Sequence, residues 1–255
     1  LAHFRLKASQ QFDWLNEAKS FLDWKRVHHI IIIPTYNEPL YILQRTLNGL
    51  KKQTFPRENL TVVVSFEERE GKAGSDKAKI LTAEFKHVFK NLLIAFHPDI
   101  PGEVKGKSAN TAWGAKIAKQ ELIDKQKENI NYATITSNDA DALLHPQYFS
   151  YLTFKFLDDP RRFEKIWQSA IQFYNNIWRL PMITRAFNRV SSVVQTGVLM
   201  RSDRLINFST YWLGSPYASF NKLAFHRFVK IPVCISNDVR FIRLHRIMFG
   251  NHKTG

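Results

Sequence analysis

The sequence predicts an α/β fold in which helices cover both faces of a mostly parallel sheet. Strand-like apolar runs alternate with helix-like patterns from residue 27 to residue 160, and polar or charged residues follow successive strands. This alternation is typical of parallel strands joined by helical crossovers. The 255 residues, 44% of them hydrophobic, suffice to bury a large core. We therefore expect one large domain over residues 27–255, preceded by a helical segment over residues 1–26.

The first β-α unit lies between residues 27 and 50. Val27 to Ile33 is a β-branched run closed by Pro34, which is typical of a strand buried on both faces. A helix-like pattern follows from Leu40 to Leu50. The loop Pro34-Thr35-Tyr36-Asn37-Glu38 therefore lies at the carboxyl end of a parallel strand, where open α/β sheets bind ligands. An ordinary helix-entry loop capped by Asn37 is the alternative.

The second and third strands are expected at Leu60 to Ser65 and Leu92 to Phe96, with a helix from Ser75 to Asn91 between them. The second strand runs into Glu67 and Glu68. A second polar strand end therefore follows the first.

Two lysines and a glycine open the next helix. The segment Lys105-Gly106-Lys107-Ser108-Ala109-Asn110 follows a loop rich in proline and glycine. Lysines and free backbone amides at a helix start favour an anion such as a diphosphate. The glycine spacing of a Walker loop is absent. Solvated lysines with an ordinary serine cap are the alternative.

The fourth strand, Tyr132 to Ser137, runs into Asp139 and Asp141 and is followed by a helix from Gln147 to Leu157. Side chains two apart on an extended strand point to the same side, so the two carboxylates are expected to converge. Together they suit Mg²⁺ or Mn²⁺, with phosphate oxygens and water as the other ligands. A polar connection with a capping aspartate is the alternative.

The chain is richer in aromatic residues beyond Pro160. Three strands and a helix are expected there: Trp167 to Gln172, Val193 to Met200, Val229 to Ile235, and Val239 to Met248. We interpret most rings of residues 173–190 as packing in a core, with stacking on sugars or bases, or a place at a membrane interface, as alternatives. Asp238 follows the last strand and is free to serve as a base if it faces the same cleft.

Charge and cysteine content narrow the class of partner and compartment. The net charge of +15 and the pI near 9.9 imply an anionic partner, for which nucleic acid, an acidic membrane and a nucleotide diphosphate are equally suitable. The single Cys234 excludes an internal disulfide framework and any multi-cysteine zinc site. A reducing, cytosolic compartment is the simplest fit.

Membrane contact is expected at the ends of the chain. Residues 1–26 have the pattern of one or two amphipathic helices, which either pack on the domain or lie on an anionic membrane. No stretch approaches the ~20 apolar residues that a spanning helix needs. Because the chain begins at Leu1 rather than methionine, we expect a longer protein whose flanking segments hold membrane parts.

Four segments, in this order, resemble the motifs of glycosyltransferase family 2, and more closely its membrane-associated branch of cellulose, chitin and hyaluronan synthases. Pro34 to Glu38 resembles the first-strand motif near the nucleotide, and Lys105 to Asn110 the segment beside the diphosphate. Asp139-Ala140-Asp141 is similar to the metal-binding aspartate motif. Ser236-Asn237-Asp238 resembles the Thr-Glu-Asp motif whose aspartate is the general base. Gln168 stands where such synthases carry a glutamine ahead of the acceptor region.

The chain departs from this family pattern in three places. The second strand ends in Glu67 and Glu68 where paired aspartates are usual, which makes either glutamate a candidate for base recognition. Asn237 replaces the glutamate of the Thr-Glu-Asp motif. The Gln-x-x-Arg-Trp motif of processive synthases does not follow Asp238.

The resemblance implies a GT-A fold in which residues 27–160 bind a nucleotide sugar and residues 161–255 bind the acceptor. It implies inverting, Mg²⁺- or Mn²⁺-dependent transfer from a UDP- or GDP-sugar to a carbohydrate or lipid hydroxyl, at the cytoplasmic face of a membrane. Asp238 would be the catalytic base, and Asp139 and Asp141 the metal ligands. The implied donor-binding residues are Pro34, Thr35, Tyr36, Asn37, Glu38, Glu67, Lys105, Lys107, Asn110 and Asp139, and the acceptor-binding residue is Gln168.

Two other functions stay open. A nucleotidyltransferase acting on a sugar phosphate uses similar metal carboxylates but leaves Ser236 to Asp238 without a role. A non-catalytic basic module that binds a membrane or nucleic acid would fit the charge. Carboxylates at the strand ends count against nucleic acid, because they repel phosphates unless a metal intervenes. We therefore expect a sugar transferase.

Overall fold

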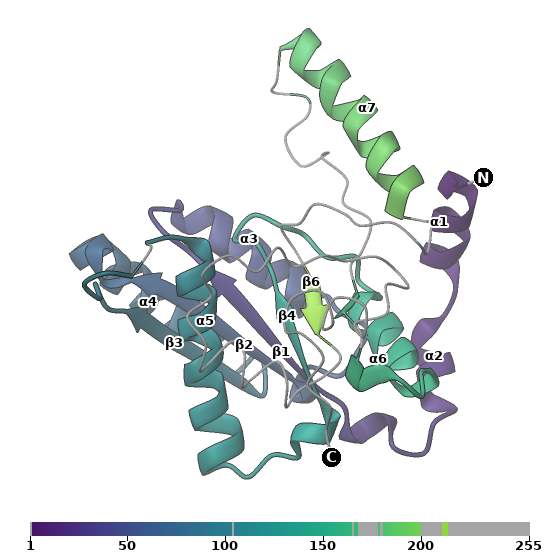
Figure 1. The fold of residues 1–255 in the computed structure, drawn as a ribbon, viewed down its shortest axis with the longest axis horizontal. Helices are drawn as coiled ribbons and strands as arrows, with labels where there is room; N and C mark the ends of the chain where they lie inside the picture. The colour runs from purple at the N-terminus through teal and green to yellow at the C-terminus, as the bar shows by residue number, and fades with distance from the viewer. Residues whose placement is uncertain are drawn as a thin grey trace, which may run out of the picture.

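The computed structural model describes residues 2–103, 105–164, 166–167, 178, 181–199 and 211–213. In this part of the chain the strands form one sheet with the order β3-β2-β1-β4-β6-β5 (Figure 1). The parallel strands are β1 (His28–Pro34), β2 (Leu60–Glu67), β3 (Asn91–His97) and β4 (Ala133–Ser137). The antiparallel strands are β5 (Ile166–Trp167) and β6 (Tyr211–Leu213). The predicted α/β class with a mostly parallel sheet is confirmed.

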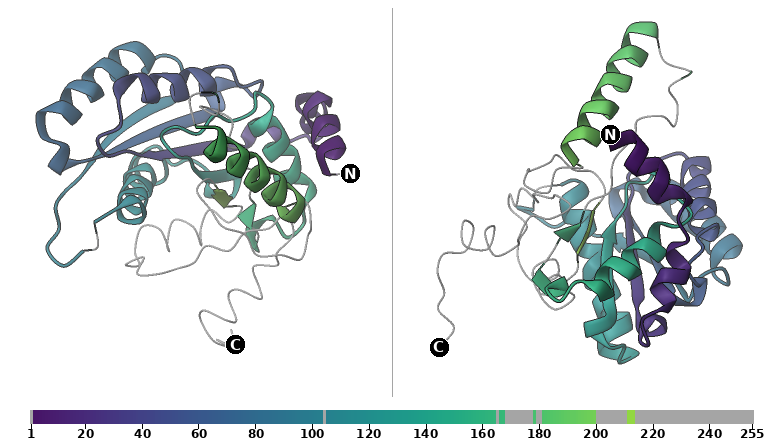
Figure 2. Two further views of the ribbon diagram at one scale, coloured as in Figure 1. Left: turned by 90° about the horizontal axis from the view of Figure 1, so that it is seen from above. Right: turned by 90° about the vertical axis from the view of Figure 1, so that its right-hand side faces the viewer.

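Helices cover both faces of this sheet (Figure 2). One face carries α3 (Leu40–Lys51), α4 (Gly71–Phe85) and α6 (Tyr148–Asp158). The other carries α5 (Lys107–Ala118), which continues into a π-helical segment, η4 (Lys119–Lys125). On β1, Ile31 and Ile33 join the first core while Ile30 and Ile32 join the second. The strand is therefore buried on both sides, as the β-branched run from Ile30 to Ile33 predicts.

The sheet order reverses beside β1. The chain passes from β1 to β2 and β3 on one side, then crosses to β4 on the other side of β1. In open α/β sheets, ligands bind outside the carboxyl ends of the strands at such a reversal. The loops after β1 and β4 are therefore the first place to look for a site.

Gly114 lets α5 approach this end of the sheet closely. A Cβ atom at that position would lie 2.8 Å from Ile32 Cγ2 and 3.3 Å from Ser65 Cβ, so any side chain would push the helix outward. The start of α5 is thereby held beside the carboxyl ends of β1 and β2.

The N-terminal segment contains α1 (Ala2–Gln11), α2 (Trp14–Lys19) and a 3₁₀ turn, η1 (Trp24–Arg26). The Trp14 ring lies 4.5 Å from the Tyr151 ring and 5.3 Å from the Phe154 ring of α6. Two helices therefore precede β1, and α2 packs on the domain.

The prediction of a strand at Val193 to Met200 is wrong. Residues up to Leu199 belong to a helix, α7 (Met182–Leu199). The β-branched run is local, whereas apolar residues recur at helical spacing over the longer segment from Ile183. Phe187 is 74% exposed, so core packing is also the wrong interpretation for that ring. Within the described residues, none of the helices has the length and apolar content needed to cross a membrane.

The remaining predictions for the C-terminal part are only partly testable. The strand expected at Trp167 to Gln172 corresponds at its start to β5. Residues 168–172, 229–235 and 239–248 lie outside the described residues.

Candidate functional site

The loop after β1 is hydrogen-bonded to β2 at its first residue and exposes its aromatic side chain. Thr35 is buried, and its backbone N–H donates to the Ser65 carbonyl (2.9 Å). Tyr36 is 41% exposed, and the Arg69 guanidinium carbon lies 3.9 Å from its ring centroid. Asn37 has a φ of 56°, a left-handed conformation that asparagine tolerates better than most residues. The loop thus presents an aromatic and an amide side chain beside the sheet edge.

A buried ion pair fixes the far side of the same loop. The Lys77 ammonium lies 2.5 Å from the Glu70 carboxylate, whose side chain is fully buried, and donates to the Glu38 carbonyl (2.8 Å). Lys77 comes from α4 and Glu70 from the turn after β2. The loop after β1 is therefore tied to the elements that follow β2.

Asn110 joins the ends of β1 and β2 to the first turn of α5. It is 1% exposed, and its side-chain N–H groups donate to the Ser65 carbonyl (2.7 Å) and the Thr35 carbonyl (3.2 Å). The Ser65 hydroxyl in turn donates to the Asn110 amide oxygen (2.6 Å). Asn110 is predicted to bind the sugar donor, but its side chain is buried between the ends of β1 and β2. It can therefore affect a ligand only by holding these two strand ends in place.

The two lysines of the segment before α5 have separate partners. Lys107, the first residue of α5, forms an ion pair with Asp139 at the end of β4. Lys105 instead lies 2.6 Å from Asp99, in the loop after β3. Lys107 and Asp139 thus meet beside β1, where the sheet order reverses. Lys105 lies nearer to β3, at the same carboxyl end of the sheet.

The aspartates after β4 lie in a turn. The strand ends at Ser137, and the Ala142 N–H donates to the Asp139 carbonyl (3.0 Å) to close the turn. The Thr46 hydroxyl donates to the Ala140 carbonyl (2.6 Å), which holds the turn against α3. Asp139 and Asp141 therefore do not lie on the extended strand, so the expectation that strand alternation brings their side chains together is wrong. Asp139 is half-buried, and Asp141 is exposed.

The donor set after β4 fits a cation that arrives with other ligands. In the part of the chain that the structure describes, no group of three or more His, Cys, Asp or Glu side chains is placed to hold a metal. One oxygen of Asp139 already accepts from Lys107. Two neighbouring carboxylates still suit Mg²⁺ or Mn²⁺, because these ions keep several waters and are commonly bound through one or two carboxylates plus substrate phosphates. Asp139 and Asp141 fit that role.

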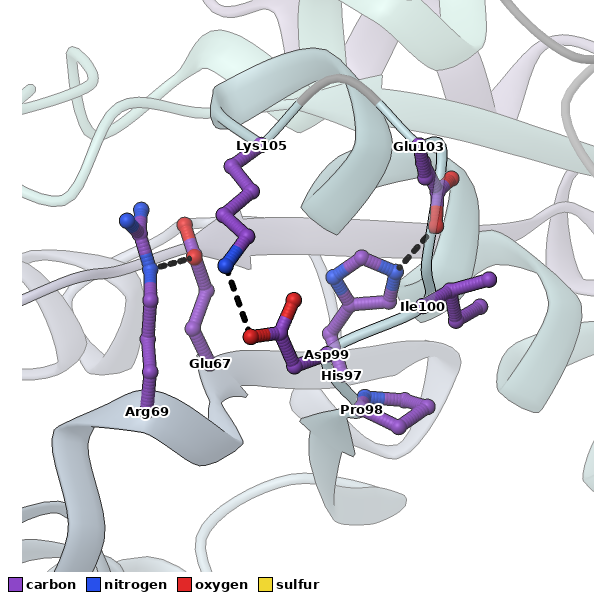
Figure 3. Close-up of a pocket in the computed structure, with 8 residues that line it drawn as sticks. All are labelled: Glu67, Arg69, His97, Pro98, Asp99, Ile100, Glu103 and Lys105. Carbon is purple, nitrogen blue, oxygen red and sulfur yellow. Dashed lines mark hydrogen bonds and ion pairs between the residues drawn. The ribbon is translucent and has the colours of Figure 1, made fainter.

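A polar pocket opens at the carboxyl ends of β2 and β3 (Figure 3). Its wall contains Glu67, which is buried and lies 2.5 Å from the Arg69 Nε. This hydrogen bond raises the pKa of Arg69, so the guanidinium stays charged beside the carboxylate. Glu68 is exposed and does not line the pocket. Of the two glutamates that the sequence offered, Glu67 is the one that lines this pocket.

The other wall of this pocket comes from β3 and the loop after it. His97 lies 3.2 Å from a Glu103 carboxylate oxygen, and its ring is 5.4 Å from the Trp113 ring. The Lys105–Asp99 pair stands between the two walls (Figure 3). Sequence reasoning missed Arg69 and His97. The available signal was their position at or just after the ends of two predicted parallel strands.

Two predicted site residues cannot be placed. Asp238, the predicted catalytic base, and Gln168, the predicted acceptor-binding residue, lie outside the described residues. Their roles stay predictions.

Comparison with known proteins finds likeness at the level of solved structures. No family model matches the chain, and no curated protein matches it. The mannosyltransferase PcManGT from Pyrobaculum calidifontis, in complex with GDP-Man and Mn²⁺, is 15% identical with a TM-score of 0.49, over 89% of this chain and 59% of that one. S. aureus TarS 1–349 in complex with UDP is 14% identical with a TM-score of 0.45, over 81% and 52%.

A third similar structure is S. aureus TarS 1–349 in complex with UDP-GlcNAc, which is 18% identical with a TM-score of 0.40, over 61% of this chain and 37% of that one. The chain thus spans less than two thirds of the length of each of these structures.

Proposed function

We propose that this chain is the catalytic part of a family 2-like, GT-A glycosyltransferase that moves a sugar from a UDP- or GDP-sugar to a carbohydrate or lipid hydroxyl. The observation that supports this best is the ion pair between Lys107 and Asp139. It joins the start of α5 to the end of β4 at the reversal of the sheet order. An ammonium, a carboxylate and a helix start there face the place where α/β sheets bind nucleotides.

The start of α5 supplies the groups that a diphosphate needs. The first backbone amides of a helix have no carbonyl within the helix to bond to, and the helix dipole adds positive charge at that end. Lys107 places an ammonium at the same point. When a nucleoside diphosphate leaves a sugar, negative charge grows on its oxygens. Lys107 and the α5 amides therefore stabilise the leaving group.

The turn after β4 supplies the metal ligands in this proposal. Asp139 and Asp141 would hold Mg²⁺ or Mn²⁺ together with the diphosphate. When bound, the cation supplies further neutralisation of the leaving group. The hydrogen bond from Thr46 to the Ala140 carbonyl keeps the turn in place beside α3, so the carboxylates are held before the donor arrives.

We propose that the base binds across the mouth of the pocket beside β2 and β3, because the pocket itself, about 10 Å³, has room only for a water-sized group. An ionised carboxylate only accepts hydrogen bonds, so Glu67 favours a base with a ring N–H on its edge, as uracil and guanine have. The corresponding ring nitrogens of cytosine and adenine are acceptors. Arg69 holds Glu67 and lies against the Tyr36 ring. Tyr36 thereby offers a flat surface next to the carboxylate, on which a base can stack.

The acceptor side of the proposal rests on residues outside the described part. We propose that residues 27–160 bind the donor and residues 161–255 the acceptor, with Gln168 contacting the acceptor. Asp238 would remove the proton from the attacking hydroxyl, so that attack opposite the diphosphate inverts the anomeric centre. Membership of the membrane-associated synthase branch and a place at the cytoplasmic membrane face belong to the same proposal.

The test is calorimetric titration of UDP and GDP, with and without Mn²⁺, into the wild type, Asp141→Asn and a matched control. The control is Asp124→Asn, because Asp124 pairs with Lys119 within η4, which follows the opposite end of α5. We expect Mn²⁺-dependent binding of one diphosphate, lost in Asp141→Asn and kept in Asp124→Asn. Absence of nucleotide binding, or equal binding by both variants, would overturn the proposal. Turnover of a nucleoside triphosphate with a sugar phosphate would instead establish nucleotidyl transfer.

A further inference from the structure

Strand β3 forms an open edge of the sheet. In the described part of the chain it pairs with β2 on one side and with no strand on the other (Figure 1). From Leu92 to Phe96 its sequence is Leu-Leu-Ile-Ala-Phe, and these side chains are half-buried except that of Ala95. Proteins usually protect such an edge with charged residues, proline or a bulge. This run contains neither a charged residue nor a proline, so the edge can pair with another extended chain.

A groove of about 480 Å³ lies between this edge and α4. Ile94 and Phe96 line it from the strand, and Ala78 and Ala83 line it from the helix. The other lining residues, all on α4, are Ser75, Lys79, Thr82 and Lys86. Ligand sites in proteins commonly have volumes of about 300–1,000 Å³. The groove therefore has room for several side chains of a segment that lies along β3.

The charged residues that line the groove are both lysines. Lys79 and Lys86 are exposed and stand about two helical turns apart, or about 10 Å along the axis of α4. An extended chain covers that distance in about three residues. The acidic residues of α4 do not line the groove: Asp76 lies 3.5 Å from the Lys79 ammonium, and Glu84 accepts from Gln44 of α3 (2.8 Å). The groove thus combines apolar walls with positive charge, which complements acidic side chains.

We propose that this groove binds an extended segment of a partner protein, in which apolar and acidic side chains alternate along one face. The segment adds a strand to the outer edge of β3. Its apolar side chains cover Ile94 and Phe96, and its acidic side chains pair with Lys79 and Lys86.

A second copy of the chain is a poorer occupant of this edge. Pairing two β3 edges would bring no acidic residue to the groove, because residues 91–97 contain no Asp or Glu. Each copy also carries a net charge of +15, which opposes their approach. The proposal does not depend on sugar transfer, so it can fail or succeed independently of the proposed function.

The test is fluorescence anisotropy of a labelled peptide, Val-Thr-Asp-Thr-Val-Thr-Glu-Thr-Val, titrated with the full chain. When the peptide is extended, its Val, Asp and Glu side chains share one face, and its two carboxylates are about 13 Å apart. We expect saturable binding that weakens about fivefold when glutamine replaces both acidic residues of the peptide. The double variant Lys79→Gln/Lys86→Gln should lose the same factor for the acidic peptide. Lys51→Gln/Lys72→Gln is the matched control, because these lysines are exposed outside the groove.

Two further measurements test the groove and the strand pairing separately. Ala83→Glu places a longer, negatively charged side chain in the groove and should weaken binding about tenfold. The same change at Ala73, which is exposed on α4 outside the groove, should leave binding unchanged. Alternate N–H groups of a strand point to opposite sides, so N-methylation of either the odd or the even residues of the peptide, but not of both sets equally, should abolish binding.

Four results would overturn the proposal. The wild type fails to bind the acidic peptide, or binds the glutamine peptide equally well. Ala83→Glu binds as tightly as Ala73→Glu. The two methylated peptides bind equally. Light scattering shows a wild-type dimer in solution that Ala83→Glu dissociates, in which case a second copy occupies the edge. Circular dichroism of each variant verifies that the fold is intact.

Discussion

Acid should destabilise this fold through a buried histidine at the amino end of β1. His28 is 5% exposed, and its Nε2 lies 2.9 Å from the Thr61 hydroxyl. Burial lowers the pKa of His28 from 6.5 to about 4, even though Glu128, 3.5 Å from Nδ1, favours the charged form. The neighbouring His29 is fully buried between the hydroxyls of Thr134 and Thr153, and burial lowers its pKa as well.

Stability falls with falling pH because the unfolded chain binds the proton of His28 more tightly than the folded chain does. Above pH 6.5, His28 is neutral in the folded and unfolded chain. As the pH falls, the unfolded chain takes up the proton first, so stability is lost between about pH 6.5 and pH 4. The loss from His28 alone is about 2 kcal/mol at pH 5 and about 3.4 kcal/mol once the pH is below the folded value. His29 adds to this loss in the same direction.

The assay is urea unfolding of the wild type, His28→Gln and His87→Gln at pH 7 and pH 5. Glutamine keeps a side-chain N–H for Thr61 but does not titrate, so the difference between the two pH values should shrink by about 2 kcal/mol in His28→Gln. His87 is exposed on the surface and serves as the control, with a pH difference like that of the wild type. An unchanged pH difference in His28→Gln would refute the reasoning.

Three further predictions concern the site and its supports. Gly114→Ala should lower the free energy of unfolding by about 1–3 kcal/mol, because the new methyl group meets Ile32; an unchanged melting temperature would contradict this. Asn110→Ala should cost about 1–3 kcal/mol and weaken diphosphate binding, since it removes the side-chain hydrogen bonds to the Thr35 and Ser65 carbonyls and the amide oxygen that accepts from the Ser65 hydroxyl. An effect no larger than that of the exposed Asn48→Ala would argue against the brace. Glu67→Gln should preserve the fold but reduce the preference for UDP or GDP over CDP in calorimetry; unaltered selectivity would remove Glu67 from base recognition.

The sequence was sufficient for the parallel half of the fold. Val27 to Ile33 and Leu60 to Ser65 are short segments rich in β-branched residues, which is typical of strands buried on both faces. The fold class and the polar strand ends follow from such runs and the helices between them. The relative order of the strands does not, because nothing in the local pattern specifies that β4 pairs with β1 on the side away from β2.

The misses have physical causes. The segment from Val193 is β-branched locally, but it belongs to a helix that begins at Met182, so the helical spacing is seen only over the longer range. The Ala142 N–H closes the turn at Asp139 by donating to the Asp139 carbonyl. The turn is held in place by the Thr46 hydroxyl, which donates to the Ala140 carbonyl from a helix far away in sequence. Arg69 meets Glu67 through side-chain geometry that the pattern of apolar residues does not contain.

The most direct measurement of the central claim uses the paramagnetism of Mn²⁺ in amide NMR spectra of the chain with UDP or GDP. The account predicts that signals of residues 139–142 and of the first turn of α5 broaden when Mn²⁺ is added with the nucleotide, and that Mg²⁺ causes shifts without broadening. Broadening centred away from these residues, or none at all with either nucleotide, would contradict the account.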